Sequence, residues 1–305
     1  MYNNRATSYL TLPRADNTIR AYLSDWQDFQ AWCKKNKVKY LPATAETVGN
    51  YISDLADVVC ANTVARHLTA ISSFHIQLGW GSDNPAKNWE VRRIMANIKR
   101  SHGTHQHGKA AITPALLRQM LPLFNDSLQS IRDKAIILLG FAGALRRSEI
   151  AALQVGDVNF SGAGMLVTIE KSKTDKYGQG QTIAIPTAAT TDLCPVQAVK
   201  NWLQAANIKN GFLFRALWKG YRVKRDKMCD KAIALIVKEY CAKIGLDASE
   251  YSGHSLRRGF ATAAAAANVS SFDIMRQTRH KSESMVNRYI AEGKAFENHP
   301  LSKIL

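Results

Sequence analysis

The chain has 305 residues, of which 46% are hydrophobic and 21% are charged, a composition that is ordinary for a folded protein and argues against wholesale disorder. Lysine and arginine total 41 against 24 acidic residues, and the resulting net charge of +17 favours a polyanionic partner. The apolar stretches are too short to span a bilayer and the sequence shows no leader pattern, which excludes membrane and secreted proteins. The five cysteines form no CxxC pair, so we expect a cytoplasmic protein with reduced thiols.

The first 102 residues contain four segments with the three- and four-residue apolar spacing of amphipathic helices. These predicted helices start at Asp16 or Asn17, at Thr44, at Asn62 or Thr63, and at Asn88. Each start carries a residue type that caps helices, and Gly79 is placed to end the third helix. The sequence therefore predicts a small all-helical domain over residues 1–102.

Residues 103–110 are predicted to form an interdomain linker, because the stretch 101–109 holds two glycines and no apolar side chain. His102, His105 and His107 could in principle hold a metal ion. No carboxylate or cysteine lies nearby to complete the ligand shell, so a solvated linker is the favoured interpretation. Residues 1–110 carry 14 basic and 8 acidic side chains and residues 111–305 carry 27 and 16, so we expect both parts to contact a polyanion.

Residues 111–305 are predicted to form a second domain. Thr113 followed by Pro114 is typical of a helix start. In chain order we then expect an apolar helix over 132–144, a β-hairpin of strands 165–170 and 181–186 around a polar, glycine-bearing tip, and helices from residue 193 to the end. The predicted fold class is mainly α with a small antiparallel β-sheet.

Several motifs of catalysis are missing from the sequence. There is no GxxxxGK[ST] phosphate loop, no HExxH and no acidic cluster suited to two metal ions. The sequence therefore gives no support to nucleotide hydrolysis or to a metal-dependent nuclease, and it predicts no cofactor and no metal.

Three segments of the second domain contain cationic, imidazole and phenolic groups. GALRRSEI places Arg146 at the end of the apolar helix with Glu149 one turn later; YSGHSLRRG places His254 and Arg257 on one face of a helix start; RHKSESMVNRYI places His280 nine residues before Tyr289. Each group alone has an ordinary structural interpretation, such as a helix-end arginine or a capping histidine.

In this order, the three segments resemble the tyrosine site-specific recombinases (phage integrase family), and within that family the Cre recombinase group. The first motif, Gly-Leu-Arg-x-x-Glu, matches GALRRSE with Ala144 inserted between Gly143 and Leu145. The second, His-x-x-Arg, matches SGHSLRRG, and the third is a histidine or tryptophan nine residues before the tyrosine. A second arginine, Arg147 or Arg258, directly follows each motif arginine, so the choice of Arg146 and Arg257 depends on motif alignment.

The resemblance implies a role for each matched residue. Arg146 and Arg257 clamp the non-bridging oxygens of a phosphodiester, which guanidinium groups suit because they are planar forks that stay charged. His280 adds a hydrogen bond, Glu149 orients a neighbouring arginine or histidine, and His254 is the general base for Tyr289, whose ordinary pKa is about 10. A hairpin lysine, best matched by Lys173 with Lys171 and Lys176 as alternatives, protonates the leaving 5′ oxygen. The 3′-phosphotyrosine stores the bond energy, so rejoining needs neither ATP nor a metal.

The resemblance also implies an architecture and partners. We expect a C-shaped clamp, made of a helical core-binding domain and a catalytic domain, closed around double-stranded DNA with a specific recombination site. Four protomers are expected to assemble on two sites through the C-terminal helix, for which the apolar tail residues Phe296, Leu301, Ile304 and Leu305 are candidates. DNA contacts are expected by analogy from two sets of residues: Arg66, His67, Arg92, Arg93, Lys99 and Arg100, and Lys219, Arg222, Lys224 and Arg225.

Two functions other than integration, excision or resolution by a recombinase are compatible with this fold. A catalytically silent DNA-binding regulator would be expected to lack at least one of the six catalytic groups, and all six are present. A type IB topoisomerase-like enzyme would share the chemistry, but the compact N-terminal domain and the Cre-like order of segments argue against it.

Overall fold

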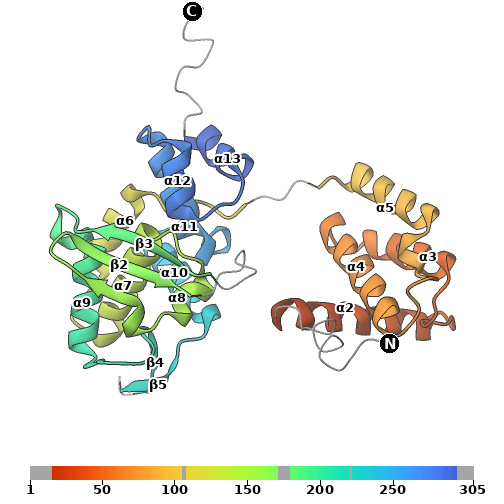
Figure 1. Ribbon diagram of the computed structural model, residues 1–305, viewed down its shortest axis with the longest axis horizontal. Helices are drawn as coiled ribbons and strands as arrows, with labels where there is room; N and C mark the ends of the chain where they lie inside the picture. Colours follow the sequence, from red (N-terminus) through yellow and green to blue (C-terminus); the bar gives the residue numbers. More distant parts are fainter. Residues whose placement is uncertain (1–15, 105–107, 171–178, 220–221, 294–305) are drawn as a thin grey trace, which may run out of the picture. The chain divides into compact units, whose positions relative to one another are not determined.

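The computed structural model describes residues 16–104, 108–170, 179–219 and 222–293. The chain divides into two compact units, residues 1–107 and 108–305, and the division falls within the segment predicted to be the linker. Each unit has its own buried apolar cluster and its own set of helices (Figure 1).

The first unit consists of the four predicted helices: α2 (Asp16–Lys35), α3 (Ala45–Ala56), α4 (Ala61–Gln77) and α5 (Trp89–His102). The side chain of Thr44 caps α3 by accepting from the Thr47 backbone N–H at 3.1 Å, and Asn88 caps α5 in the same way. The N-cap of helix α4 is Cys60, which precedes the predicted capping residues Asn62 and Thr63. A 3-10 turn (Pro85–Lys87) precedes α5.

The core of this unit is aromatic. Trp26 stacks on Phe74 with ring centroids 4.7 Å apart, and Phe29 lies edge-on to Tyr51. The Tyr51 hydroxyl is bonded to His67 at 2.8 Å, and His67 in turn contacts Asp25. The packing of α2 on α4 and of α3 on α5 encloses this cluster.

The second unit begins with four helical segments, α6 (Pro114–Met120), a 3-10 turn (Leu121–Leu123), α7 (Leu128–Ala142) and α8 (Arg147–Ala152). After another such turn (Val155–Asp157) come β1 (Val158–Phe160), β2 (Gly164–Ile169) and β3 (Gln181–Pro186). The chain continues through a 3-10 turn (Thr191–Leu193), α9 (Pro195–Ala205), β4 (Arg215–Leu217), β5 (Val223–Lys227) and α10 (Asp230–Lys243). A last 3-10 turn (Ala248–Glu250) leads to α11 (Gly253–Ala266), α12 (Ser271–Thr278) and α13 (Glu283–Gly293).

The predicted hairpin is confirmed as β2 and β3, which pair antiparallel with Val167 opposite Ile183, and β1 adds a third strand beside β2. The prediction that the chain is wholly helical after residue 193 is wrong, because β4 and β5 form a second antiparallel pair. Five of the eight residues in these two strands are charged, so the apolar alternation that marks a strand is too weak to read from the sequence.

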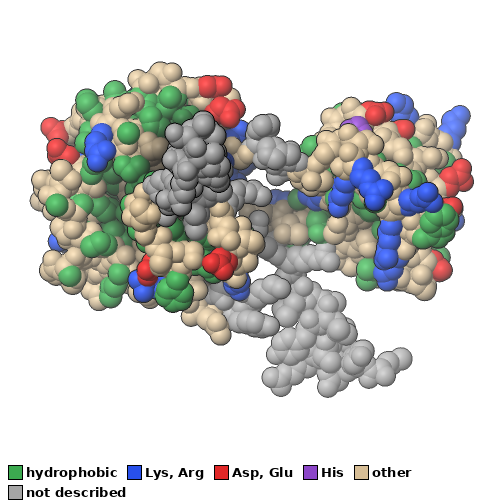
Figure 2. Space-filling model, turned by 90° about the horizontal axis from the view of Figure 1, so that it is seen from above, with side chains coloured by type: hydrophobic (Ala, Val, Ile, Leu, Met, Phe, Trp, Pro, Cys, Tyr) green, Lys and Arg blue, Asp and Glu red, His purple; other side chains and the backbone are tan. Residues whose placement is uncertain are grey.

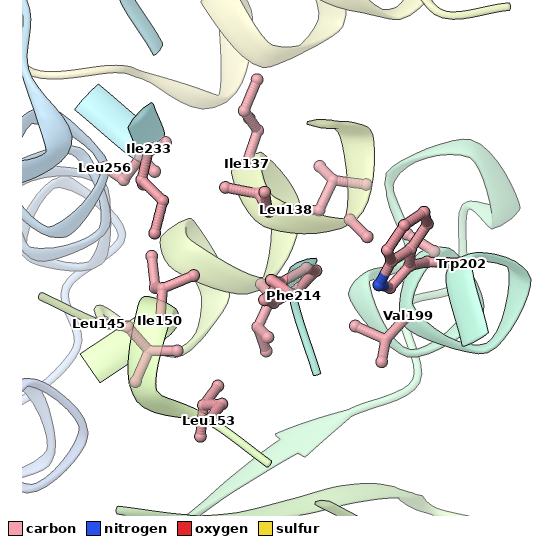
Figure 3. Close-up of a cluster of buried hydrophobic side chains, with 14 of the residues drawn as sticks. Ile137, Leu138, Leu145, Ile150, Leu153, Val199, Trp202, Phe214, Ile233 and Leu256 are labelled. Carbon is pink, nitrogen blue, oxygen red and sulfur yellow. The ribbon is translucent and has the colours of Figure 1, made fainter. Parts of the chain in front are cut away.

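Helix α7 forms the centre of the second unit. Its residues 135–139 are all buried, as expected of a helix that is covered on every side. Figure 3 shows side chains from α7, α8, α9, α10 and α11 directed toward this shared interior. Trp202 is fully buried there and donates its indole N–H to the carbonyl oxygen of Leu213 at 2.8 Å.

The chain enters the second unit along α11. Backbone N–H groups of Ala110 and Ile112 donate to the carbonyl oxygens of Glu250 and Ser255 at 2.8 and 3.0 Å. A Cβ atom at Gly259 would lie 1.9 Å from the carbonyl oxygen of Ile112, so only glycine permits this approach. Lys109 and Ala110, which the sequence assigned to the linker, are therefore bonded into the second unit.

Candidate active site

Arg146 and Glu149 lie where α7 gives way to α8. Helix α7 ends at Ala142, so Arg146 is the N-cap of α8 and does not close the preceding helix as predicted. Glu149 accepts from the backbone N–H of Arg146 at 2.9 Å and from its Nη1 at 2.6 Å. The side chains are 12% and 2% exposed, so this pair fixes the direction of the Arg146 guanidinium within the protein.

Arg257 lies on α11 and is almost fully buried. Its Nη1 donates to the carbonyl oxygen of Ala144 at 2.8 Å, and its buried Nη2 has no hydrogen-bond partner among the described residues. Burial, together with the charges of Arg146 and Arg279, lowers the pKa of Arg257 to about 9, so the group remains protonated near neutral pH. A buried cation with an unsatisfied N–H group is well suited to donate a hydrogen bond to a phosphate oxygen.

Ala144, which the first motif places between Gly143 and Leu145, adopts a left-handed backbone with φ of 45° and is completely buried. This conformation turns its carbonyl oxygen toward α11 and α12, where it accepts from Arg257 at 2.8 Å and from Nη2 of Arg279 at 3.3 Å. Ala144 therefore supplies the acceptor that holds Arg257.

Arg279 is a site residue that the sequence analysis missed. It ends α12, is 5% exposed, and donates through Nη2 to Glu149 Oε2 at 2.7 Å. Glu149 consequently bridges Arg146 and Arg279. No motif spacing marks Arg279, because its contact partners precede it by 130 residues or more.

His280 follows directly and is 9% exposed. Thr278 Oγ1 donates its single proton to the carbonyl oxygen of Ile274 at 2.6 Å, so its 2.8 Å contact with Nδ1 of His280 requires the proton on Nδ1. Burial, followed by the charges of Arg257, Arg146, Arg279 and His254, lowers the pKa of His280 to about 4. The neutral ring therefore has a lone pair on Nε2.

Tyr289 lies on α13 and is half-buried, with its ring centroid 5.7 Å from that of His280. Helix α13 packs against α11 and α12 through a small cluster that contains Ala261, Ile274 and Val286. Figure 1 shows these three helices side by side. His254 is exposed on the first turn of α11.

In each pair of adjacent arginines, 146/147 and 257/258, the two side chains have different surroundings. Arg147 is half-exposed and pairs with Asp230 at 3.1 Å. Arg258 donates to the carbonyl oxygen of Lys109 at 2.7 Å, at the entry of the chain into the unit. Only Arg146 and Arg257 of the four contact the groups around Glu149 and Ala144 in the described part of the chain.

The candidate lysines Lys171, Lys173 and Lys176 lie outside the described residues. The hairpin that carries them leaves β2 at Ile169 and returns to β3 at Gln181. Residues at the base of the hairpin, Gln179 and Gly180, line a pocket of about 430 Å³ together with Arg279 and His280. The hairpin therefore begins and ends beside the candidate site.

Basic side chains cover parts of both units. Figure 2 shows lysine and arginine side chains gathered on one face of the first unit. Four of the predicted DNA contacts are exposed on α5: Arg92, Arg93, Lys99 and Arg100. Four more lie on or beside β4 and β5: Lys219, Arg222, Lys224 and Arg225. Lys224 is half-buried over the ring of Trp218.

Two of the predicted DNA contacts are engaged inside the first unit. Arg66 forms a two-point ion pair with Asp25 at 2.8 and 2.9 Å. His67 is 4% exposed and lies between Tyr51 and Asp25, so it is a core residue and not a surface contact as predicted. The sequence pattern could not distinguish these positions, because basic residues on a helix face are read as solvent-facing.

One group of described residues has metal-ligand composition, namely Asp25, Asp28 and His67 in the first unit. Both carboxylate oxygens of Asp25 are already bonded to Arg66, an arrangement that does not fit a cation site. His102 ends α5, while His105 and His107 lie outside the described residues. Among the described residues, no helix combines the length and apolar character needed to cross a membrane.

Comparison with known proteins identifies the family. The phage integrase family model matches residues 110–295, and the model of the phage integrase N-terminal SAM-like domain matches residues 7–80. The integrase/recombinase xerD homolog of Selenomonas ruminantium is 46% identical over 302 residues, which cover 98% of this chain and 89% of the relative. Recombinase cre of Escherichia phage P1 is 27% identical over 296 residues, with 90% and 84% covered.

Solved structures share the fold at low sequence identity. The Tn1549 transposon integrase in complex with transposon right end DNA aligns with a TM-score of 0.64 at 14% identity, covering 98% of this chain and 95% of that one. A lambda integrase dimer bound to a COC' core site aligns with a TM-score of 0.59 at 16% identity, covering 94% and 93%. The chain belongs to the phage integrase family and is a tyrosine recombinase, an enzyme that cleaves and rejoins DNA.

Proposed function

We propose that this recombinase exchanges strands at a specific duplex site, with Tyr289 attacking the scissile phosphodiester to form a 3′-phosphotyrosyl bond. The observation that carries the proposal is the convergence of Arg146, Arg257 and His280, whose charges are close enough to act on one another, with the Tyr289 ring 5.7 Å from the histidine. The site of action is the bacterial cytoplasm, in keeping with the bacterial relative.

Arg146 and Arg257 clamp the two non-bridging oxygens. Attack by a phenolic oxygen increases the negative charge on these atoms, and guanidinium groups already fixed by Glu149 and by the Ala144 carbonyl need no reorganisation to stabilise it. The unpartnered Nη2 of Arg257 is the donor that substrate would satisfy.

His280 takes up a proton when DNA binds. Its Nδ1–H is held by Thr278, so only a proton on Nε2 allows the ring to donate to a phosphate oxygen. The negative charge of the phosphate raises the histidine pKa from its low value in the free protein.

Proton transfers complete the step. His254, on the exposed first turn of α11, accepts the phenolic proton as Tyr289 Oη bonds to phosphorus. Lys173 gives a proton to the 5′ oxygen as its bond to phosphorus breaks, and the attachment of the hairpin beside His280 supports this role. A 5′-hydroxyl then attacks the phosphotyrosine, which releases Tyr289 and restores the phosphodiester.

Both units are proposed to contact the DNA. The exposed basic residues of α5 in the first unit and of β4–β5 in the second are proposed to contact phosphates. Arg66 is a weaker candidate because Asp25 already neutralises it.

Four protomers are proposed to assemble on two sites. An apolar pocket of about 480 Å³ on the second unit is lined by Leu117, Phe141, Ile185, Leu193, Pro195 and Phe260 among others. We assign to it the C-terminal tail of a neighbouring protomer, whose Phe296 and Leu301 match it in character. Phe296→Ala with Leu301→Ala is expected to preserve cleavage of a single site and abolish the paired-site complex on a native gel; an unchanged complex would remove the tail from the interface.

Covalent capture tests the chemistry. Wild-type protein is incubated with duplex fragments from the DNA flanking its gene, and adducts that survive denaturant identify the cognate duplex. Tyr289→Phe is expected to bind this duplex as wild type does and to form no adduct. Tyr240→Phe, on α10 against Phe124, is the matched control that keeps the adduct. An adduct with Tyr289→Phe would assign the nucleophile to another residue.

A further inference from the structure

Arg279 occupies a costly position in the fold. It closes α12 with a left-handed backbone, φ 58° and ψ 39°, a conformation that is strained for a residue with a Cβ and that glycine adopts freely. Its side chain is 2% exposed, and burial lowers its pKa below the usual value. Its Nε has no hydrogen-bond partner among the described residues.

Among the described residues, the side-chain hydrogen bonds of Arg279 are with the turn between α7 and α8 and with Glu149 in α8. Nη2 donates to Glu149 Oε2 at 2.7 Å and to the carbonyl oxygen of Ala144 at 3.3 Å, and Nη1 donates to the carbonyl oxygen of Gly143 at 3.3 Å. The guanidinium therefore connects the end of α12 to a segment that lies 130–136 residues earlier in the chain.

Two of these acceptors also hold the arginines of the proposed phosphate clamp. Glu149 binds Nη1 of Arg146 at 2.6 Å, and the Ala144 carbonyl binds Nη1 of Arg257 at 2.8 Å. Arg279 thus touches both supports at once. Because the Glu149 carboxylate is shared between two guanidinium groups, it neutralises neither fully.

We propose that Arg279 is a positioning residue that fixes the two acceptors behind the phosphate clamp. It sets the orientation of Arg146 through Glu149 and that of Arg257 through the Ala144 carbonyl. This inference rests on the clamp role given to the two arginines under the proposed function. It concerns how they are held and assigns Arg279 no contact with DNA.

The position offers a clean substitution. Arg279→Gly removes the guanidinium and keeps a residue that adopts the left-handed backbone, so the end of α12 can stay in place. Arg276→Ala is the matched control, since it removes a charge from the same helix at a side chain that is 74% exposed. Thermal unfolding and the dissociation constant for the cognate duplex are measured for both variants.

The decisive readout is the single-turnover rate of adduct formation with the protein in excess over the cognate duplex. Arg279→Gly is expected to slow this rate at least 30-fold while the dissociation constant changes less than threefold. Arg276→Ala is expected to change the rate less than twofold. A wild-type rate in Arg279→Gly, or a loss confined to DNA affinity, would overturn the inference.

A second variant tests whether Arg279 acts through Glu149. The rates of adduct formation are compared for Arg279→Gly, for Glu149→Gln and for the double variant. The losses of rate are expected to overlap, so that the rate of the double variant is within threefold of that of the slower single variant. Fully multiplied losses would show that Arg279 acts independently, contrary to the inference. Tyr289→Phe separates the two proposals: an adduct there refutes the proposed nucleophile, whereas a failure in the Arg279 variants alone refutes only the positioning role.

Discussion

The buried guanidinium of Arg257 donates to the carbonyl oxygen of Ala144, a residue 113 positions earlier in the chain, at 2.8 Å. The bond exists because Ala144 has a left-handed backbone. The backbone conformation of Ala144, in the first motif, therefore determines the position of a side chain in the second.

Ala144→Val is expected to slow cleavage more than tenfold. A β-branched residue is disfavoured at a φ of 45°, so the turn must rearrange and its carbonyl oxygen must move away from Arg257. Ala144→Gly, which adopts this backbone freely, should stay within threefold of wild type. Single-turnover adduct formation measures both, and equal rates in all three proteins would show that the carbonyl does not hold the arginine.

The doubled arginines are expected to differ sharply in function. Arg146→Ala and Arg257→Ala should lower the adduct rate at least 100-fold, since each removes a fixed cation from the clamp. Arg147→Ala removes a half-exposed ion pair with Asp230, and its adduct rate should stay within threefold of wild type. Arg258→Ala should lower the free energy of unfolding by about 1–2 kcal/mol, because Lys109 loses a charged donor. A reversed order within either pair would contradict the assignment.

Acid is expected to destabilise the protein partly through His280. The unfolded histidine binds a proton near its ordinary pKa of about 6.5, whereas the folded one does so at about 4. Stability is therefore lost as pH falls through that window, by on the order of 3 kcal/mol. Asp133, whose pKa burial raises to about 6, acts in the opposite direction. Comparing denaturant unfolding of wild type and His280→Gln at pH 7 and pH 4 isolates the histidine, and identical pH slopes would remove it as the cause.

The hairpin lysine can be identified with a sulfur substrate. Replacing the scissile 5′ oxygen by sulfur creates a leaving group that departs without a proton. Lys173→Ala should cleave ordinary duplex slowly and recover nearly full cleavage on the 5′-phosphorothiolate. Arg257→Ala should show no recovery, because it acts on the non-bridging oxygens. Rescue of Lys176→Ala alone would transfer the role to Lys176, and rescue of neither would make the hairpin a DNA-contact loop.

The basic residues of the first unit should fall into two classes. Removing Arg92, Arg93, Lys99 and Arg100 together should lower the salt dependence of DNA binding, with about 0.9 in slope lost for each phosphate contact. Arg66→Gln should leave the slope unchanged and lower stability, because it breaks the pair with buried Asp25. Filter binding over a salt series and thermal unfolding measure the two effects. A reduced slope in Arg66→Gln would place that side chain on DNA.

Local patterns predicted most of the fold. Apolar spacing and capping residues identified the four helices of the first unit, and alternation identified the hairpin of β2 and β3. The strands β4 and β5 were missed because charged residues dominate them. The pairing of two such strands depends on contacts between segments and cannot be read from the residue pattern of either segment alone.

The same limit applies to the site. Arg146, His254, Arg257, His280 and Tyr289 were selected by their resemblance to the motifs of the family, and all five are linked in the structure by contacts or charges. Arg279 could not be predicted, because its role depends on Glu149 and on the backbone of Ala144. The burial of His67 depends likewise on packing between α2, α3 and α4.

The close approach of Gly259 to Ile112 has a practical meaning for engineering. A side chain at residue 259 would push the entering chain away from the helix that carries His254 and Arg257. In a library that samples every amino acid there, active clones should carry glycine alone. For the same reason, a fused domain or a split point should be placed before Gly108, where it leaves the contact between Ile112 and Gly259 intact.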